Sequence, residues 1–140
     1  MSKFRYSRLI EVKEKLLKKK QAELEMAISA VDDIAKEMRT VGQAIEDGYG
    51  SMTERCISGT DFAVLKDYLE YLDRHLKVLA EERERRNKRV VALRLELMVL
   101  ATELKMLEKL KVKAVRAFRK AENRKEQKTM DDIALRTEAL

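Results

Sequence analysis

The 140-residue chain contains no proline, no tryptophan, four glycines and one cysteine, and only 5% of its residues are aromatic. Proline in a helix interior kinks or breaks the helix at a cost of about 3 kcal/mol or more, so its absence leaves long helices possible. The single cysteine, Cys56, excludes an internal disulfide and fits a reducing compartment. No stretch approaches about eighteen uninterrupted apolar residues, and the N-terminal residues lead into no apolar signal segment. We therefore expect a soluble, cytoplasmic protein.

Charged residues make up 40% of the chain and hydrophobic residues 45%, and the hydrophobic residues are regularly spaced. Between residues 62 and 121 they recur at alternating intervals of three and four, interrupted only at Arg83, Arg86 and Lys111. Such a seven-residue repeat places the apolar side chains on one face of a helix and is typical of a left-handed coiled coil. This helix would be about 90 Å long. The stripe consists of Phe62, Leu65, Leu69, Leu72, Leu76, Leu79, Val90, Leu93, Leu97, Leu100, Leu104, Leu107, Ala114, Phe118 and Ala121.

A first helix is predicted over about residues 4–46. Its apolar positions follow a stride of seven, with polar Lys13 and Lys20 where the seam favours an apolar residue. Their long stems can lie along the seam while the charges stay in water. The stride-seven residues are Ile10, Leu17, Leu24, Val31, Met38 and Ile45.

The connection is predicted over about residues 47–60, because Gly48 and Gly50 are suited to ending a helix. Thr60 or Asp61 is the predicted N-cap of a second helix over about residues 61–136. We therefore predict an all-α fold in which the two long helices form an antiparallel coiled-coil hairpin. The hairpin is predicted to be a single domain over residues 1–140. If Ile45 lies opposite Phe62, then residue 4 at the start of the first helix lies opposite about residue 103 of the second helix. The longer second helix would then overhang.

Charge is segregated along the chain. Residues 21–82 carry six basic and fourteen acidic residues, whereas residues 105–128 carry ten basic and three acidic residues. Residues 1–20 are also basic, with eight Lys or Arg and two Glu. The turn end of the hairpin is therefore expected to be acidic and the open end basic, which suits two different partners.

Catalysis has little support in the sequence. The only histidine, His75, is next to the seam and fits a solvated helix side chain, and Cys56 has no base beside it. The chain has no glycine-rich phosphate loop and no cysteine–histidine cluster with metal spacing. We expect a protein that is not an enzyme and that binds no cofactor, metal or small molecule.

Arg83 and Arg86 fall in the predicted seam and allow two interpretations. In the first interpretation, their side chains extend from a weak seam into solvent or pair with first-helix carboxylates such as Glu23 or Glu25. In the second, they mark a point where the seam is loosened and the hairpin can bend. Since an unpaired buried charge is costly, we expect a partner carboxylate.

Several apolar residues lie outside the seam. A helix that is apolar on several sides favours more than one neighbour, so these residues are candidates for docking a partner or for a wider intramolecular interface. They are Tyr68, Tyr71, Val91, Leu95, Met98 and Val99.

The basic overhang suggests nucleic-acid binding, but no aromatic platform or base-reading motif accompanies its lysines. We favour a protein partner. The candidate contacts are Lys109, Lys113, Arg116, Arg119, Lys120 and Arg124.

The C-terminal stretch resembles the FliJ family of flagellar export proteins. The resemblance is carried by Leu107-Glu108-Lys109-Leu110-Lys111, by Glu126-Gln127-Lys128-Thr129-Met130-Asp131-Asp132 and by Arg136, with Phe4, Leu9 and Ile10 at the start. Asp131-Asp132 stands where the family typically has Asp-Glu. The related YscO proteins of virulence-type secretion systems share the same plan, so both systems stay open.

This resemblance implies a cytoplasmic coupling stalk, peripheral to the inner-membrane export apparatus. It implies three partners: a hexameric export ATPase (FliI-like), the export gate protein (FlhA-like) and export chaperones. Glu126, Asp131, Asp132 and Arg136 are carried over as matches to the family motif and join the basic residues as ATPase-binding candidates. A generic homodimeric coiled-coil scaffold and a basic coiled coil that binds nucleic acid are the alternatives.

Overall fold

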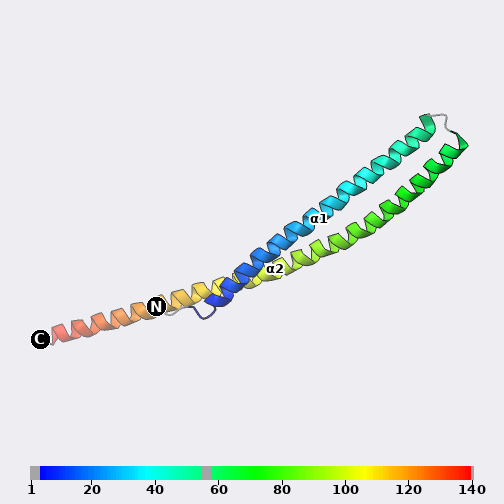
Figure 1. Cartoon of the computed structure of the whole chain (residues 1–140). Coiled ribbons are helices and arrows are strands. Elements are labelled where there is room, and N and C mark those ends of the chain that lie inside the picture. The colour runs from blue at the N-terminus through cyan, green and yellow to red at the C-terminus, as the bar shows by residue number, and fades with distance from the viewer. Residues whose placement is uncertain (1–3, 55–57, 140) are drawn as a thin grey trace. The chain divides into compact units, whose positions relative to one another are not determined.

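A computed structural model describes residues 4–54 and 58–139. Helix α1 spans Ser7–Glu54 and helix α2 spans Gly59–Glu138. The two helices pack against each other in an antiparallel arrangement, and α2 is the longer (Figure 1). This confirms the predicted all-α hairpin with an overhanging second helix. The chain forms two compact units, which are described separately: residues 20–96 (the turn unit), and residues 1–19 with 97–140 (the terminal unit). Cys56 lies outside the described residues.

The core of the turn unit is a cluster of buried seam residues near the connection. Ile34 and Val41 of α1 pack with Leu69, Leu72 and Leu79 of α2. These residues recur at intervals of three or seven, so each helix turns its apolar stripe toward the other. Partly buried residues packed against this cluster are Met38, Ala44, Ile45, Met52, Leu65 and Leu76.

Helix α1 continues past the predicted end at Glu46 and runs through both glycines to Glu54. The prediction was wrong because no described glycine has a positive φ, the conformation in which a glycine ends a helix. Gly48 serves close packing instead. A Cβ atom at Gly48 would lie 2.5 Å from Cδ2 of Leu69, which is 2% exposed. The missing side chain therefore lets the two helices approach each other.

Helix α2 begins at Gly59, and its N-cap is Ser58 rather than the predicted Thr60 or Asp61. The backbone N–H of Asp61 donates a hydrogen bond to Ser58 Oγ at 3.1 Å. A serine hydroxyl in this position satisfies one of the backbone N–H groups that has no partner within the first turn. The connection is consequently shorter than the predicted residues 47–60.

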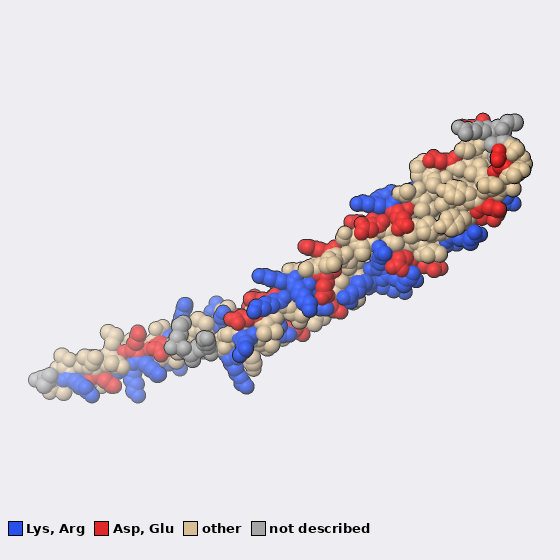
Figure 2. Space-filling model, in the orientation of Figure 1, with Lys and Arg blue, Asp and Glu red and all other residues tan. Residues whose placement is uncertain are grey.

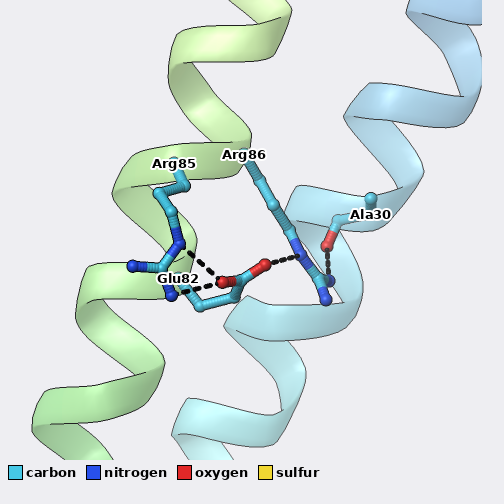
Figure 3. A network of polar contacts seen from close by, with 4 residues as sticks. All are labelled: Ala30, Glu82, Arg85 and Arg86. Carbon is cyan, nitrogen blue, oxygen red and sulfur yellow. Dashed lines mark hydrogen bonds and ion pairs between the residues drawn. The ribbon is translucent and has the colours of Figure 1, made fainter.

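One heptad of the turn unit has a polar seam. Between Leu79 and Val90 of α2 the half-buried residues are Glu82, Arg86 and Asn87, whereas Arg83 is exposed. Arg86 donates from Nη1 to the carbonyl oxygen of Ala30 in α1 at 2.7 Å (Figure 3). The prediction that Arg83 lies in the seam is therefore wrong, because Glu82 occupies the seam and neutralises Arg86.

The partner carboxylate of Arg86 comes from its own helix, not from the predicted Glu23 or Glu25. Arg86 Nε donates to Glu82 Oε1 at 3.2 Å, and Arg85 Nε donates to Glu82 Oε2 at 2.8 Å. Hydrogen bonds from Arg85 and then Arg86 hold the pKa of Glu82 below its usual range. Glu23 lies 3.6 Å from Arg89 across the helices.

The seam lysines are half-buried and paired with α2. In the turn unit, Lys20 Nζ lies 2.9 Å from Glu96 and 3.4 Å from Glu23. These bonds, Glu96 first, raise the pKa of Lys20, and the same lysine lowers the pKa of Glu96. In the terminal unit, Lys13 pairs with Glu103. At both seam positions a charge pair with α2 thus stands in place of a hydrophobic contact. Each pair joins one residue of α1 to one residue of α2 and so helps to fix the register of the helices.

The terminal unit packs the first three turns of α1 against α2. Ile10, Leu100 and Leu104 are buried, and Phe4 lines the same surface groove as Lys111. Residue 4 therefore reaches about residue 111, not the predicted residue 103. The difference arises because α1 is longer and the connection shorter than predicted, so each α1 residue faces a later part of α2. We define the overhang as residues 112–139.

Candidate partner-binding surfaces

The overhang continues the helical repeat of α2 without a covering helix. Every described residue from Glu108 onward is exposed, including residues that keep the apolar spacing of the seam. Val115 and Phe118 are 39% and 41% exposed. Large apolar side chains held in register on an uncovered helix face are typical of a partner-binding surface.

A second face of the same segment is basic. Lys109, Lys113, Arg116, Lys120 and Arg124 follow one another at intervals of three or four, so at about 100° per residue they form one stripe along α2. We call these five residues the basic stripe. Figure 2 shows Lys and Arg side chains standing out along this part of the molecule, with carboxylates between them.

Part of the basic stripe lines a shallow groove whose remaining side chains include Val112 and Glu108. The groove combines ammonium and guanidinium groups with an apolar strip, an arrangement suited to an acidic amphipathic partner. Arg119, the remaining basic candidate, lies about 60° around the helix from Arg116 and about 100° from Lys120, to one side of the stripe.

The turn unit carries a second stripe, of aromatic and apolar residues, beside its seam. Tyr68 and Tyr71 are 49% and 55% exposed, and Val64 and Val78 are also exposed. The ring of Tyr71 is stacked on His75, with ring centroids 6.1 Å apart and planes at 6°. His75 Nε2 lies 3.6 Å from Glu37 Oε1 of α1, so this stripe borders a carboxylate of the neighbouring helix.

Sequence reasoning identified the two tyrosines but missed their companions Val64, His75 and Val78. The signal was present, because residues 64, 68, 71, 75 and 78 recur at intervals of four and three, as in a second heptad seam. We call these five residues the tyrosine stripe. Its spacing matches one more helix packed along α2.

The profile of the flagellar FliJ protein family matches residues 2–139 of this chain. The match covers nearly the whole sequence and both helices. The chain belongs to the FliJ family. Comparisons with curated proteins and with solved structures find no match.

Family membership makes this chain a protein related to flagellar export. The C-terminal residues that carry the resemblance to FliJ all lie on α2, and all of them except the half-buried Leu107 are exposed. Gln127 Nε2 donates to Asp131 Oδ1 at 3.0 Å along one helix face. Asp132 and Arg136, one turn apart, lie on a different face from Asp131. The structure therefore places the motif residues Glu126, Asp131, Asp132 and Arg136 around the helix rather than in one patch.

The other docking candidates are exposed, but they belong to different units. Val91 and Leu95 lie in the turn unit and are 55% and 58% exposed. Met98 and Val99 lie in the terminal unit and are exposed as well. The wider intramolecular interface considered for them is wrong, because α1 leaves these side chains uncovered.

Within residues 4–54 and 58–139, no three His, Asp or Glu side chains are grouped so as to hold a metal ion. Neither of the helices described there contains an apolar stretch of the length that a membrane span requires.

Proposed function

We propose that this FliJ-family chain is a non-enzymatic coupling stalk of a flagellar or related type III export apparatus. On this proposal its overhang binds the hexameric export ATPase (FliI-like). One observation carries the proposal: residues 112–138 are helical and α1 leaves them uncovered, yet they retain an apolar stripe on one face and most of the basic stripe on another.

The two faces would contribute differently to binding. Burying Phe118 and Val115 against a partner helix would supply affinity, since each large apolar side chain contributes about 1.5–3 kcal/mol when fully buried. The basic stripe would speed association with an acidic surface and would select the orientation. Glu126, Asp131, Asp132 and Arg136 are proposed as further ATPase contacts around the same helix.

We propose a second partner for the turn unit. The tyrosine stripe combines exposed aromatic side chains with bordering carboxylates, and aromatic residues are enriched at interface centres. The export gate protein (FlhA-like) or an export chaperone is the proposed partner, and Val91, Leu95, Met98 and Val99 are proposed as additional docking residues. The protein would then act in the cytoplasm, peripheral to the inner-membrane export apparatus.

The test of ATPase binding uses the full chain and the export ATPase of the same organism. Arg116→Glu with Lys120→Glu reverses two charges of the basic stripe. Lys66→Glu with Lys77→Glu makes the same charge change at two exposed lysines of α2 in the turn unit, away from the overhang. We expect wild-type protein to bind the ATPase and raise its turnover, the first variant to bind at least tenfold more weakly, and the second to bind nearly as wild type. Circular dichroism confirms that both variants stay helical.

Three results would contradict the proposal. Unchanged ATPase turnover together with no binding removes the ATPase as the partner. A stable dimer in sedimentation, with no ATPase binding, favours the homodimeric scaffold. Binding to DNA or RNA whose logarithm falls linearly with the logarithm of salt concentration, again without ATPase binding, favours a nucleic-acid binder.

The second partner is tested independently with Tyr68→Ala and Tyr71→Ala together. Both tyrosines are about half exposed, so the change leaves the turn-unit core intact. We expect lost binding to the gate protein or chaperone and retained ATPase stimulation. If the variant still bound both the gate protein and the chaperone, the docking surface would lie outside the tyrosine stripe.

A further inference from the structure

The apolar seam of the turn unit is interrupted at one place. The buried cluster of Ile34, Val41, Leu69, Leu72 and Leu79 does not include Val90 or Leu93, although those two residues are 6% and 1% exposed. The intervening heptad of α2 contributes only polar half-buried side chains to the seam: Glu82, Arg86 and Asn87.

Helix α1 offers little apolar surface opposite this heptad. Its half-buried residues there are Ala27, Ala30 and Val31, and no α1 residue between Ile10 and Ile34 is fully buried. Two alanines and polar partners give few dispersion contacts, and the polar side chains keep much of their exposure to water. The packing that holds the two helices together is therefore weakest here.

Hydrogen bonds to charged groups replace the missing packing. Among the described residues 82–87, the hydrogen bond that joins the two helices is the one from Arg86 to the carbonyl oxygen of Ala30, and Glu82 holds Arg86 in place from the same helix (Figure 3). Charge pairs continue the link toward Val90 and Leu93, where Arg89 reaches Glu23 at 3.6 Å and Lys20 reaches Glu96 at 2.9 Å. Half-exposed contacts of this kind weaken when salt screens the charges.

We infer that residues 27–31 of α1 and 82–87 of α2 form a joint at which the helices separate locally while the Leu69–Leu79 cluster stays packed. Arg86 closes the joint. Opening replaces its hydrogen bonds to Ala30 and Glu82 by hydrogen bonds to water, a change that costs little because the guanidinium is already partly solvated. The inference concerns the hairpin itself and does not depend on the proposed stalk role.

Hydrogen exchange on the full-length protein, measured by mass spectrometry at 0.05 M and 1 M NaCl, tests the joint. At low salt we expect the amides of residues 27–31 and 82–87 to exchange faster than those of residues 36–45 and 69–79. At high salt the joint should exchange roughly two- to fivefold faster still, the range that corresponds to losing half-exposed ion pairs. The cluster amides should change little.

Two variants separate a joint from ordinary fraying. Arg86→Leu adds an apolar residue to the seam opposite the alanines, so we expect about tenfold slower exchange across the joint and loss of its salt dependence. Arg85→Leu is the matched control, because Arg85 binds the same carboxylate at 2.5 Å but is 63% exposed and makes no hydrogen bond or ion pair with the described residues of α1. It should leave exchange nearly unchanged.

Uniform protection along the wild-type seam would overturn the inference, and so would equal effects of the two variants. If Arg86→Leu changed the helix register or caused dimerisation while wild-type exchange stayed uniform, Arg86 would be a residue that fixes register, as polar seam residues do in other coiled coils. Sedimentation velocity measured alongside exchange distinguishes these outcomes.

Discussion

The apolar repeat of α2 has the same spacing near Leu69 and near Phe118, but only the first region is covered. Leu69 is 2% exposed and packs against the backbone of α1 at Gly48, whereas Phe118 is 41% exposed with no α1 segment beside it. Heptad spacing places side chains on one face in both regions. Whether that face becomes a core or a binding surface depends on how far the partner helix extends.

The largest expected difference between the two regions is in stability. Leu69→Ala removes a buried side chain from the turn-unit cluster, and we expect it to lower the free energy of unfolding by about 2–5 kcal/mol. Leu135→Ala makes the same chemical change on the overhang, where the leucine is 65% exposed, and should stay within about 0.5 kcal/mol. Urea unfolding of both variants measures the difference, and equal losses would show that the overhang is also packed.

A smaller effect is expected at the glycines of α1. Gly48→Ala places a methyl group 2.5 Å from Leu69 Cδ2, so strain of about 1–3 kcal/mol exceeds the gain of about 1 kcal/mol in helix propensity. Nothing lies within 4 Å of a Cβ atom at Gly42, so Gly42→Ala should stabilise the hairpin by about 0.5–1 kcal/mol. Thermal unfolding should therefore shift in opposite directions. A stabilising Gly48→Ala would show that the close approach of the helices is not maintained.

A pH dependence should distinguish the charged seam from the apolar cluster. The pKa of Glu96 is lowered, chiefly by its hydrogen bond from Lys20, so the pair stabilises the fold above the ordinary glutamate pKa of about 4.3 and is lost as the pH falls below it. The pKa of Lys20 is raised, so the same contribution disappears as the pH rises above the ordinary lysine range.

Glu96→Gln should therefore flatten the fall of the melting temperature between about pH 5 and pH 2. Glu84→Gln, which removes an exposed carboxylate from the same helix, is the control and should leave the wild-type slope. Identical slopes for wild type and Glu96→Gln would mean that the Lys20–Glu96 pair contributes nothing to stability in solution.

We expect a substitution at Phe118 to have the smallest effect on stability and a clear effect on binding to the export ATPase. Phe118→Ala should change the free energy of unfolding by less than about 0.5 kcal/mol because α1 does not cover the ring. On the proposed function, it should weaken binding to the export ATPase, which calorimetry or biolayer interferometry can measure. Unaffected ATPase binding would remove the apolar face of the overhang from the proposed interface.

Most of the fold could be predicted from spacing alone, because a long heptad repeat without proline has few other solutions. The predictions that were wrong concern positions whose environment is set by the other helix. Gly48 was interpreted as a helix end, since the sequence contains no sign that Leu69 approaches its backbone. Glu82, rather than Arg83, lies in the seam, where its carboxylate neutralises Arg86. Which of the two residues faces α1 depends on how the two helices pack, and the sequence of α2 alone does not determine it.

The candidate surfaces were only partly predictable. The basic residues of the overhang and the two tyrosines could be identified from charge and from apolar residues off the seam. The companions of the tyrosines, Val64, His75 and Val78, were missed because a second stripe is noticed only after the first seam has been assigned. The motif residues Asp131, Asp132 and Arg136 are close in sequence, but Asp131 lies on a different side of α2 from Asp132 and Arg136.

The sequence by itself determined that this protein is a pair of long helices with a basic, unmatched C-terminal extension, because local helical periodicity and charge are properties of the chain alone. Only the tertiary structure decided the register of the pair, and with it the starting point of the overhang near residue 112. Register depends on contacts between residues far apart in sequence, such as Gly48 with Leu69 and Lys13 with Glu103. A heptad repeat permits many such alignments, and only complementary packing and charge pairing select one.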